Sequence, residues 1–378
     1  MKIAIVNHDF SLGGVQRVAI EIAGSLSQVE GYSVSLVSFS GNDNFFFDVS
    51  EKCKKEVNTK KRTFSENLKF RMAIKRCRRI EISRVYRNQL RGLILILREG
   101  GFDCVILCQS DLTALIPRIK AEVPSIKAIG WQHNDFETYF TNYDYAKLFL
   151  GEYTAGLEWA DYIVCLTEND QQQFKKYNSN TSFIYNPLTL KTDKISNLKN
   201  NSVIFTGKTS LNQKGMDYFI QLATRSPSHW NFQAAGDGAD IDAIKKTVKD
   251  KNLDSKIQFI GAVKDAELLK HYLSGDVFVS TSRWEGFGLA IIEAMKCGLP
   301  IVAFDNNGPR EILDGGKYGI LIERFNVDQM YKELAKLMND DKLRKIYQEK
   351  SLKRVERFSL DQIVEEWKEI IDGMQRFE

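Results

Sequence analysis

The stretch of the chain best suited to chemistry is SRWEGFGLAIIEAMKCG, which spans Ser282–Gly298. Its two glutamates, Glu285 and Glu293, stand eight residues apart. On a continuous helix that spacing is about two turns, so both carboxylates would face one bound molecule. Carboxylates accept hydrogen bonds from the paired hydroxyls of a sugar or a ribose. Taken singly, Glu285 would instead be an acid at a helix N-terminus, and Glu293 a solvated surface residue.

A glycine-rich turn follows the first glutamate and is expected to open onto a helix. The residues of this turn and of the helix start are Gly286, Phe287, Gly288 and Leu289. The backbone N–H groups at the start of a helix have no partner within it and accept phosphate well. Glycine at positions 286 and 288 lets a ligand approach the backbone closely. The segment as a whole therefore predicts a site for a ligand that carries phosphate and sugar hydroxyls.

The composition is that of a folded protein with two domains. The chain has 378 residues, of which 43% are hydrophobic and 27% charged, and this excludes global disorder. No apolar run is long enough to span a bilayer, and the first residues do not resemble a signal peptide. The six cysteines form no CxxC pair, so we expect reduced thiols in a cytosolic protein, without a disulfide scaffold or a zinc site.

Positive charge is concentrated in one segment, which suggests an anionic partner at that place. Glu51–Arg98 contains sixteen Lys and Arg against four Glu, a net charge of +12, whereas the rest of the chain carries −8. Within this segment Phe70–Ile82 is predicted to form one amphipathic helix, with an apolar face from Phe70 to Cys77. Its basic face contains Lys75, Arg76, Arg78 and Arg79.

Such a helix is expected to lie on an anionic membrane surface, where each basic residue contributes about 1 kcal/mol. Alternatively, it is a solvated helix that packs on its own domain through the same apolar face. Nucleic acid is not expected as a partner, because no recognised DNA- or RNA-binding module accompanies the basic residues.

Short β-branched strands alternate with helices in both halves of the chain, the pattern of doubly wound parallel sheets. In the first half the predicted strands are Ile3–Asn7, Val34–Phe39, Cys104–Cys108, Ile126–Trp131, Tyr162–Leu166 and Phe183–Tyr185. The predicted helices there are Val15–Ser27, Leu68–Glu99, Leu112–Ala121 and Asp170–Tyr177. In the second half the predicted strands are Val203–Thr206, Asn231–Ala235, Ile257–Ile260, Val277–Ser280 and Ile301–Phe304.

We therefore predict an α/β protein with two Rossmann-like domains, residues 1–187 and 188–358. The polar stretch Lys191–Ser202 has the composition of a linker between them. A last helix, about 359–378, is expected to pack back on the first domain. Ligands of doubly wound sheets bind at the carboxyl ends of the strands, so a central cleft between two facing sheets is the expected site.

The spacing of Glu285 and Glu293 within EGFGLAIIEAMKCGLPIVA resembles the E-x7-E motif of retaining glycosyltransferases of family 4, which have the GT-B fold. Further landmarks resemble those of the family in the same order over nearly the whole chain. They are Gly13–Arg17, Phe205–Lys208 with Lys214–Gly215, Ala235–Gly238, Phe259–Val263 and Asn307–Ile312. Each short motif is weak by itself, and their order across some three hundred residues carries the resemblance.

The resemblance implies roles for residues of the second domain, which would bind a nucleotide-sugar donor. Lys208 and Lys214 match the cations that contact the leaving diphosphate, although the family more often has Arg at the first position. Glu293 matches the carboxylate that binds the ribose hydroxyls, and Glu285 the one that faces the donor sugar. Gly236 lies in the matching GDG turn, and the backbone at Val263 would hold the base.

In the first domain, which would bind the acceptor, the resemblance assigns Gly13 and Gly14 to a loop that approaches the diphosphate. Gln16 replaces the Glu of many members, which weakens an acid role there. His133 follows the strand Ile126–Trp131 and matches a strand-end histidine near the transferred sugar, where it would hydrogen-bond or polarise the sugar. It could also be a structural histidine. His8 also ends a strand and could line the acceptor side.

The family retains the anomeric configuration, and its favoured mechanism is a same-face displacement in which the leaving phosphate oxygen takes the acceptor proton. We therefore assign no protein base. A double displacement would need a nucleophilic carboxylate, and the sequence assigns none. No metal or other cofactor is expected, because lysines and backbone dipoles can neutralise the diphosphate. The Asp-x-Asp pattern at Asp240 begins a helix and suits capping.

The expected function is that of a hexosyltransferase-type enzyme that takes its sugar from a UDP-linked donor. Its acceptor would be a lipid-linked or membrane-associated glycan, in bacterial cell-surface polysaccharide synthesis on the cytoplasmic side of the membrane. Two alternatives are a sugar-nucleotide epimerase of the same fold and a non-catalytic scaffold partner of a glycosyltransferase. A dehydrogenase is least expected, because no GxGxxG follows the first strand of either half.

Overall fold

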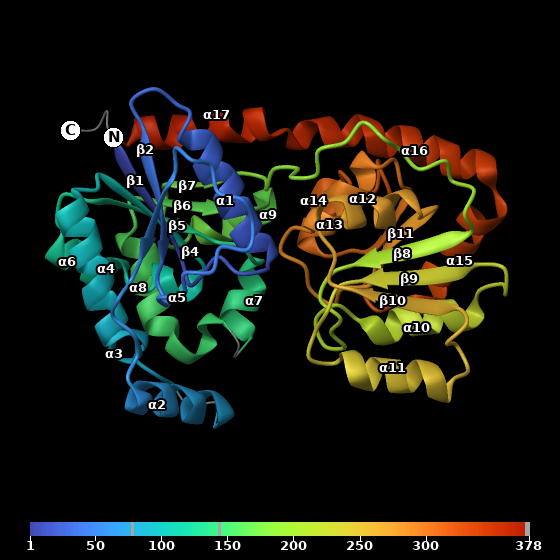
Figure 1. Ribbon diagram of the computed structural model, residues 1–378, viewed down its shortest axis with the longest axis horizontal. Helices are drawn as coiled ribbons and strands as arrows, with labels where there is room; N and C mark the ends of the chain where they lie inside the picture. Colours follow the sequence, from blue (N-terminus) through green and yellow to red (C-terminus); the bar gives the residue numbers. More distant parts are fainter. Residues whose placement is uncertain (77–78, 143–144, 375–378) are drawn as a thin grey trace. The chain divides into compact units, whose positions relative to one another are not determined.

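The computed structural model describes residues 1–76, 79–142 and 145–374. The chain divides into two compact units (Figure 1). Unit 1 comprises Met1–Pro187 together with the chain from Leu360 onward, and unit 2 comprises Leu188–Ser359. Each unit is a parallel β-sheet covered by helices on both faces, as the alternation of short apolar strands with helices predicts.

The sheet of unit 1 has seven parallel strands in the order β3-β2-β1-β4-β5-β6-β7. Their bounds are β1 (Lys2–Asn7), β2 (Ser33–Ser38), β3 (Lys54–Val57), β4 (Cys104–Cys108), β5 (Lys127–Trp131), β6 (Tyr162–Cys165) and β7 (Thr181–Phe183). The strand order reverses between β1 and β4, so their carboxyl ends flank the crevice where doubly wound sheets bind ligands.

Helices α4, α6 and α8 cover one face of this sheet, and α1 and α17 cover the other (Figure 1). The helices of unit 1 are α1 (Gly14–Leu26), α2 (Phe64–Lys75), α3 (Ile82–Val85), α4 (Arg87–Gly100), α5 (Ser110–Thr113), α6 (Ile116–Glu122), α7 (Phe136–Thr141), η1 (Ala146–Phe149), α8 (Leu150–Trp159), α9 (Glu168–Phe174) and α17 (Leu360–Gly373). The last helix packs on unit 1 through a buried stripe that includes Trp367, whose ring meets Trp131 edge-on at 4.8 Å.

The prediction of one helix over Leu68–Glu99, with Phe70–Ile82 as its amphipathic part, is wrong. Helix α2 ends at Lys75, and the chain is extended at Glu81 before α3. Tertiary hydrogen bonds break the helix: the N–H of Ile80 donates to the carbonyl of Leu148 at 2.8 Å. The N–H of Ile82 donates to the carboxylate of Glu152 on α8. These partners bind backbone groups that a continuous helix would use itself.

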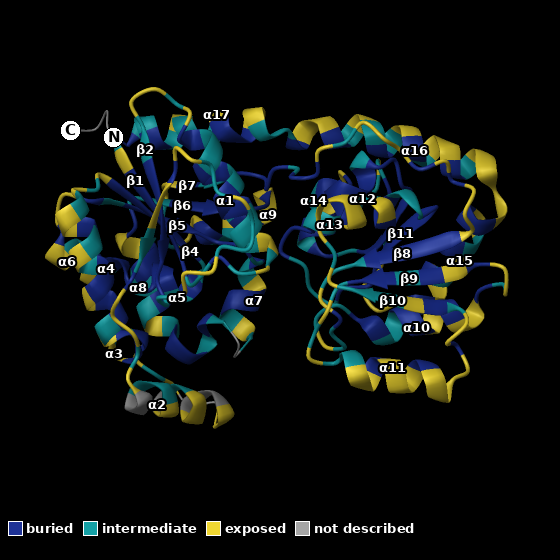
Figure 2. Ribbon diagram, in the orientation of Figure 1, coloured by how far each residue is buried: buried dark blue, intermediate teal, exposed yellow. Residues whose placement is uncertain are grey.

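The sheet of unit 2 has six parallel strands in the order β10-β9-β8-β11-β12-β13. Their bounds are β8 (Ser202–Thr206), β9 (Asn231–Ala235), β10 (Ile257–Gly261), β11 (Val277–Ser280), β12 (Ile301–Phe304) and β13 (Ile320–Ile322). The helices are α10 (Met216–Arg225), α11 (Ile241–Asp250), α12 (Asp265–Leu273), α13 (Leu289–Lys296), α14 (Asn307–Ile312), α15 (Val327–Asn339), α16 (Asp341–Val355) and the short η2 (Glu356–Phe358). Figure 2 shows the buried strands between helices that expose only their outer faces.

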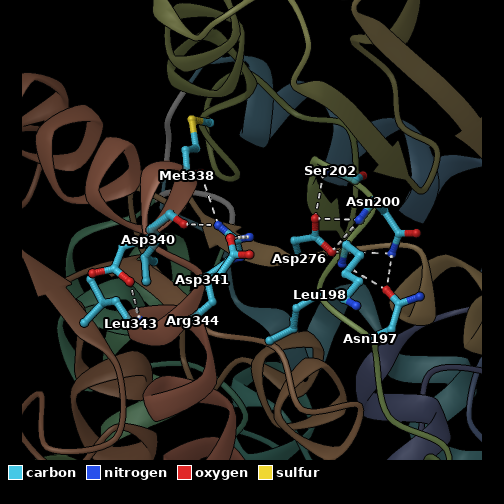
Figure 3. A network of polar contacts seen from close by, with 12 residues as sticks. Asn197, Leu198, Asn200, Ser202, Asp276, Met338, Asp340, Asp341, Leu343 and Arg344 are labelled. Carbon is cyan, nitrogen blue, oxygen red and sulfur yellow. Dashed lines mark hydrogen bonds and ion pairs between the residues drawn. The ribbon is translucent and has the colours of Figure 1, made fainter.

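The composition of the polar stretch 191–202 suggested a linker between the two units. This prediction is wrong, because the stretch belongs to unit 2. Its backbone is tied to the amino-terminal edge of the sheet, where the N–H of Asn200 donates to the buried carboxylate of Asp276 at 2.8 Å (Figure 3). Burial raises the pKa of Asp276, and the backbone donors oppose that rise. The Ser196 hydroxyl also donates to Gly275 O at 2.6 Å. Polar residues in this stretch therefore serve internal hydrogen bonds.

No helix of the described residues combines the length and the apolar composition that crossing a bilayer requires.

Replacing Trp367 by alanine should lower the free energy of unfolding of unit 1 by about 3–5 kcal/mol, because a fully buried aromatic side chain leaves a cavity against Trp131. Urea denaturation followed by circular dichroism measures the loss. Glu369→Ala, on the exposed face of the same helix, should change it by less than about 0.5 kcal/mol. Equal effects of the two variants would contradict the docking of α17 through its apolar stripe.

Candidate functional site

Backbone groups of three glycine-rich loops join the carboxyl ends of β8, β9 and β10 in unit 2. The N–H of Gly207 donates to Ala235 O at 2.9 Å, and the N–H of Gly236 donates to Gly261 O at 2.7 Å. Gly236 has φ = 133°, and a Cβ atom there would lie 1.8 Å from Gly207 O. Only glycine fits this position, so the GDG turn is explained by backbone contact between neighbouring loops.

The structure brings Lys214 and Glu285 together at this edge of the sheet, although 71 residues separate them. The ammonium group of Lys214 donates to Oε2 of Glu285, and the Ser282 hydroxyl donates to the same oxygen at 3.2 Å. The two charged side chains are only 17% and 15% exposed. A partly buried cation held beside a carboxylate and close to a helix start is suited to an anionic ligand that carries hydroxyls.

Helix α13 begins as the sequence predicts, with Gly288 as the residue before Leu289 and φ = 111°. The ring of Phe287 is 2% exposed and meets Phe358 edge-on at 5.8 Å, so this residue anchors the turn from inside unit 2. Behind the turn, a Cβ atom on Gly308 would lie 2.2 Å from Phe287 O. Gly286 and Gly288 are buried and Leu289 is half-buried, with the first N–H groups of α13 directed out of the helix.

Glu293 lies inside unit 2, and it is not the solvated surface residue of the alternative interpretation. Its side chain is 5% exposed, and its two oxygens accept hydrogen bonds from Tyr272 Oη at 2.7 Å and Thr189 Oγ1 at 3.3 Å. Burial and then the charge of Glu293 raise the pKa of Tyr272 well above its ordinary value, so the phenol stays a donor. These two bonds orient the carboxylate of Glu293.

The other predicted donor-binding residues lie around the same edge. Lys208 is exposed in the loop after β8, and Val263 is half-buried in the loop after β10. A Cβ atom on Gly207, next to Lys208, would lie 3.6 Å from Cε of Lys214, so the aliphatic part of Lys214 runs along this loop. The described contacts do not join Lys208 to Glu285.

Sequence reasoning missed Arg283, which holds the loop that carries Lys214. Its guanidinium donates to both oxygens of Asp217 at 2.9 and 2.8 Å and stacks over the ring of Tyr218 at 4.3 Å. Hydrogen bonds to Asp217 raise the pKa of Arg283 further. Its position two residues before Glu285 is a local signal, but nothing in the sequence points to Asp217 as its partner.

In unit 1, the predicted glycine loop lies between β1 and α1. Gly13 is the residue before α1 and has an extended backbone, and Gly14 is the first residue of the helix. The side chain of Gln16 folds over this position, since a Cβ atom on Gly13 would lie 2.2 Å from Gln16 Oε1. The amide of Gln16 therefore lies over the Gly13 position of this loop.

His133 follows β5 and is buried, with 6% of its surface exposed. Its ring lies 4.3 Å from that of Trp131, and among the described residues neither ring nitrogen has a hydrogen-bond partner. Burial lowers the pKa of His133 to about 3, so the imidazole is neutral near pH 7. The N–H groups of His133 and Asn134 both donate to Tyr139 Oη, which fixes the backbone here.

The predicted membrane residues Lys75, Arg76 and Arg79 are exposed, whereas Arg78 and Cys77 lie outside the described residues. Leu68 and Met72 of α2 are 48% and 41% exposed. They stand four residues apart and so share one helix face.

Three comparisons with known proteins bear on these geometries. The family model for glycosyl transferases group 1 matches residues 189–354, and that for glycosyltransferase family 4 matches residues 12–191. An uncharacterized glycosyltransferase of Haemophilus influenzae is 32% identical over 377 residues, covering 96% of this chain and 97% of that protein. The chain belongs to glycosyltransferase family 4.

Solved structures show the same two-domain fold over the full length. Sucrose-phosphate synthase from Thermosynechococcus elongatus has a TM-score of 0.81 at 16% identity, covering all of both chains. The Anabaena protein HepE, solved with UDP and glucose, has a TM-score of 0.77 at 16% identity, with 98% of this chain and 99% of that chain covered. This family 4 enzyme therefore has the GT-B fold, with two Rossmann-like domains, and transfers a sugar from a nucleotide sugar.

Among the described residues no group of three or more His, Cys, Asp and Glu side chains is arranged to hold a metal ion. Independence from metal stays a prediction.

The buried, neutral state of His133 predicts a pH-dependent loss of stability. The folded-state pKa of about 3 lies below the ordinary value of 6.5, so between these values the unfolded chain takes up a proton that the folded chain does not. Stability therefore falls as the pH drops below 6.5. From neutral pH to about pH 5 this residue alone should cost about 2 kcal/mol.

Urea unfolding of the wild type and of His133→Asn at pH 7 and at about pH 5 measures this loss of stability. The variant should lose less stability on acidification, because asparagine does not titrate. His229→Asn, which removes a histidine whose side chain is exposed, is the control and should follow the wild type. A wild-type pH dependence unchanged in His133→Asn would contradict a neutral buried imidazole.

Proposed function

We propose that this family 4 enzyme is a retaining glycosyltransferase that binds a UDP-linked sugar at the carboxyl edge of the unit 2 sheet. The pairing of Lys214 with Glu285 supports the proposal most directly, because it sets one cation and one carboxylate side by side at that edge. The cation suits the diphosphate and the carboxylate suits the sugar hydroxyls. The UDP in the HepE structure supports the choice of nucleotide.

In this proposal the leaving diphosphate is stabilised by Lys214, by Lys208 and by the first N–H groups of α13. Each opposes the negative charge that develops as the bond to the sugar breaks. When no donor is bound, Glu285 neutralises Lys214, which keeps both side chains in place. The preformed positions reduce the reorganisation that binding requires.

Glu293 binds the ribose hydroxyls, oriented by Tyr272 and Thr189. The loops at Gly236 and Val263 bring backbone close to the nucleotide. In unit 1, His133 offers a neutral imidazole that suits hydroxyl groups of a sugar, and Gly13 and Gly14 offer backbone N–H groups at the start of α1. The leaving phosphate oxygen takes the acceptor proton in a same-face displacement, so no protein base and no metal are assigned a step.

Unit 1 binds the acceptor in this proposal, and α2 places it at an anionic membrane surface on the cytoplasmic side. Leu68 and Met72 expose apolar surface, and Lys75, Arg76 and Arg79 add positive charge. The apolar residues that face solvent thus differ from those predicted, because Phe70 turns inward to Tyr86. A lipid-linked glycan of the bacterial cell surface suits such a location.

Lys214→Ala should reduce release of UDP from UDP-sugars by about 10²–10³-fold, because the developing diphosphate charge loses its buried cation. UDP-glucose, UDP-galactose and their N-acetyl forms serve as test donors. Lys246→Ala, an exposed lysine of α11, should leave the rate unchanged. A wild type that neither releases UDP nor gains thermal stability from UDP would refute the proposal, and free epimerised nucleotide sugar would favour the epimerase.

Replacing Lys75, Arg76, Arg78 and Arg79 by glutamine should abolish sedimentation with phosphatidylglycerol vesicles, because about 1 kcal/mol of attraction is lost per charge. The same charge change in unit 2 should leave vesicle binding intact. This control replaces four of the exposed lysines of unit 2 by glutamine, namely Lys332, Lys342, Lys345 and Lys353. UDP release should not change in either variant. Undiminished binding of the first variant would exclude the end of α2 and the basic residues that follow it as the membrane contact.

A further inference from the structure

A second histidine of unit 1, His8, forms a partly buried polar cluster that the donor chemistry does not use. His8 follows β1, and Asp111 lies in α5 just beyond β4, the neighbouring strand. Nε2 of His8 lies 2.5 Å from Oδ2 of Asp111, and the Tyr86 hydroxyl donates to the same oxygen at 2.9 Å. The cluster therefore lies at the carboxyl ends of β1 and β4, where the strand order reverses and ligands of such sheets bind.

The guanidinium group of Arg62 lies over the ring of Tyr86, whose hydroxyl belongs to this cluster. Cζ of Arg62 is 5.3 Å from the ring centre of Tyr86 and 5.2 Å from that of Phe70. Among the described residues no carboxylate pairs with Arg62, and its buried Nη1 has no hydrogen-bond partner. The carboxylate of Asp9, which acts on His8, accepts hydrogen bonds from the N–H and the hydroxyl of Ser11. The cluster thus contains a cation without a counter-charge.

His8 adds positive charge to the cluster. Burial lowers its pKa, but the charge and hydrogen bond of Asp111 outweigh burial and the repulsion from Arg62, so the pKa of His8 is raised. Burial raises the pKa of Asp111, and His8 reverses this, so the aspartate remains ionised. The side chains of His8 and Asp111 are 29% and 18% exposed. With Nε2 bonded to Asp111, Nδ1 of the imidazolium remains as a donor for a ligand.

We propose that His8 and Arg62 bind a phosphate ester of the acceptor. This inference rests on the proposed function, in which unit 1 holds the acceptor. A phosphate oxygen would accept from His8 Nδ1 and from the guanidinium, and it would supply the counter-charge that Arg62 lacks. Asp111 is a positioning residue, because it fixes the ring of His8 and keeps it protonated. The acceptor class is therefore a polyol or sugar that carries a phosphate ester.

The test is histidine side-chain NMR of the full chain. The sequence has four histidines, so His8→Gln identifies the His8 signal by its disappearance. With saturating UDP present to occupy the donor's phosphate site, glycerol 3-phosphate is added, and glycerol at equal concentration is the neutral control. The His8 signal should shift saturably with glycerol 3-phosphate and stay in place with glycerol. An unmoved His8 signal, or equal shifts with both compounds, would overturn the inference.

Two variants and a matched control distinguish a role in phosphate binding from a purely structural role of the cluster. Arg62→Gln should weaken the response to glycerol 3-phosphate about tenfold or more, the loss of one charge-assisted contact. Arg84→Gln, the same change at a guanidinium that is 80% exposed and paired with Glu81, should respond as the wild type. Asp111→Asn should lower the pKa of His8 read from the same signal and weaken the response.

Undiminished binding by Arg62→Gln would refute the role of the guanidinium. UDP release from UDP-sugars by each variant is measured in parallel. If the wild type releases UDP but its His8 signal does not respond to glycerol 3-phosphate, the acceptor site alone is rejected. If the wild type releases no UDP, the proposed function is rejected.

Discussion

The ion pair between Lys214 and Glu285 is the interaction on which the proposed chemistry of unit 2 depends. The two residues follow neighbouring strands, β8 and β11, and their loops meet only because Gly215 has no side chain. A Cβ atom there would lie 2.2 Å from Thr281 O. Arg283 then fixes the loop through Asp217. A cation that is partly buried needs such a partner, since an unpaired charge at this depth would cost several kcal/mol. The carboxylate therefore holds the lysine in place at this edge of the sheet.

Two histidines at strand ends of unit 1 show how their neighbours decide protonation. His133 packs on the ring of Trp131, and burial lowers its pKa to about 3. His8 faces the carboxylate of Asp111, and its pKa is raised despite burial. The first is therefore neutral and the second is favoured in its charged form. A neutral imidazole suits hydroxyl groups of a sugar, and an imidazolium suits an anion. The carboxyl edge of the unit 1 sheet thus carries one neutral imidazole and one imidazole that is favoured in its charged form.

The strands were largely predictable because buried parallel strands are short apolar runs, and those at Cys104–Cys108 and Val277–Ser280 have the predicted bounds. Strand β3, with the sequence KKEV, was missed because an exposed edge strand carries charge instead of apolar residues. The periodicity of Leu68–Glu99 indicated one helix, but hydrogen bonds to residues far along the chain interrupt it. For the candidate site, the order of the short motifs along the chain predicted Lys214 and Glu285 as site residues. The pair of His8 and Asp111, 103 residues apart, leaves no local pattern in the sequence.

Counting charge along Glu51–Arg98 treats its basic residues as one surface, but the fold gives them different environments. Lys75, Arg76 and Arg79 remain in water, where each is stable alone. Arg62 instead packs on aromatic rings, and its buried Nη1 has no hydrogen-bond partner within the part of the chain that the structure describes. A buried donor without a partner costs about 1–3 kcal/mol or more for a charged group. A bound anion would remove this cost, so the same residue that destabilises the unliganded unit would strengthen its complex. This exchange of stability for binding is common at functional sites. Such an exchange would account for the partly buried guanidinium of Arg62, which has no carboxylate partner among the described residues.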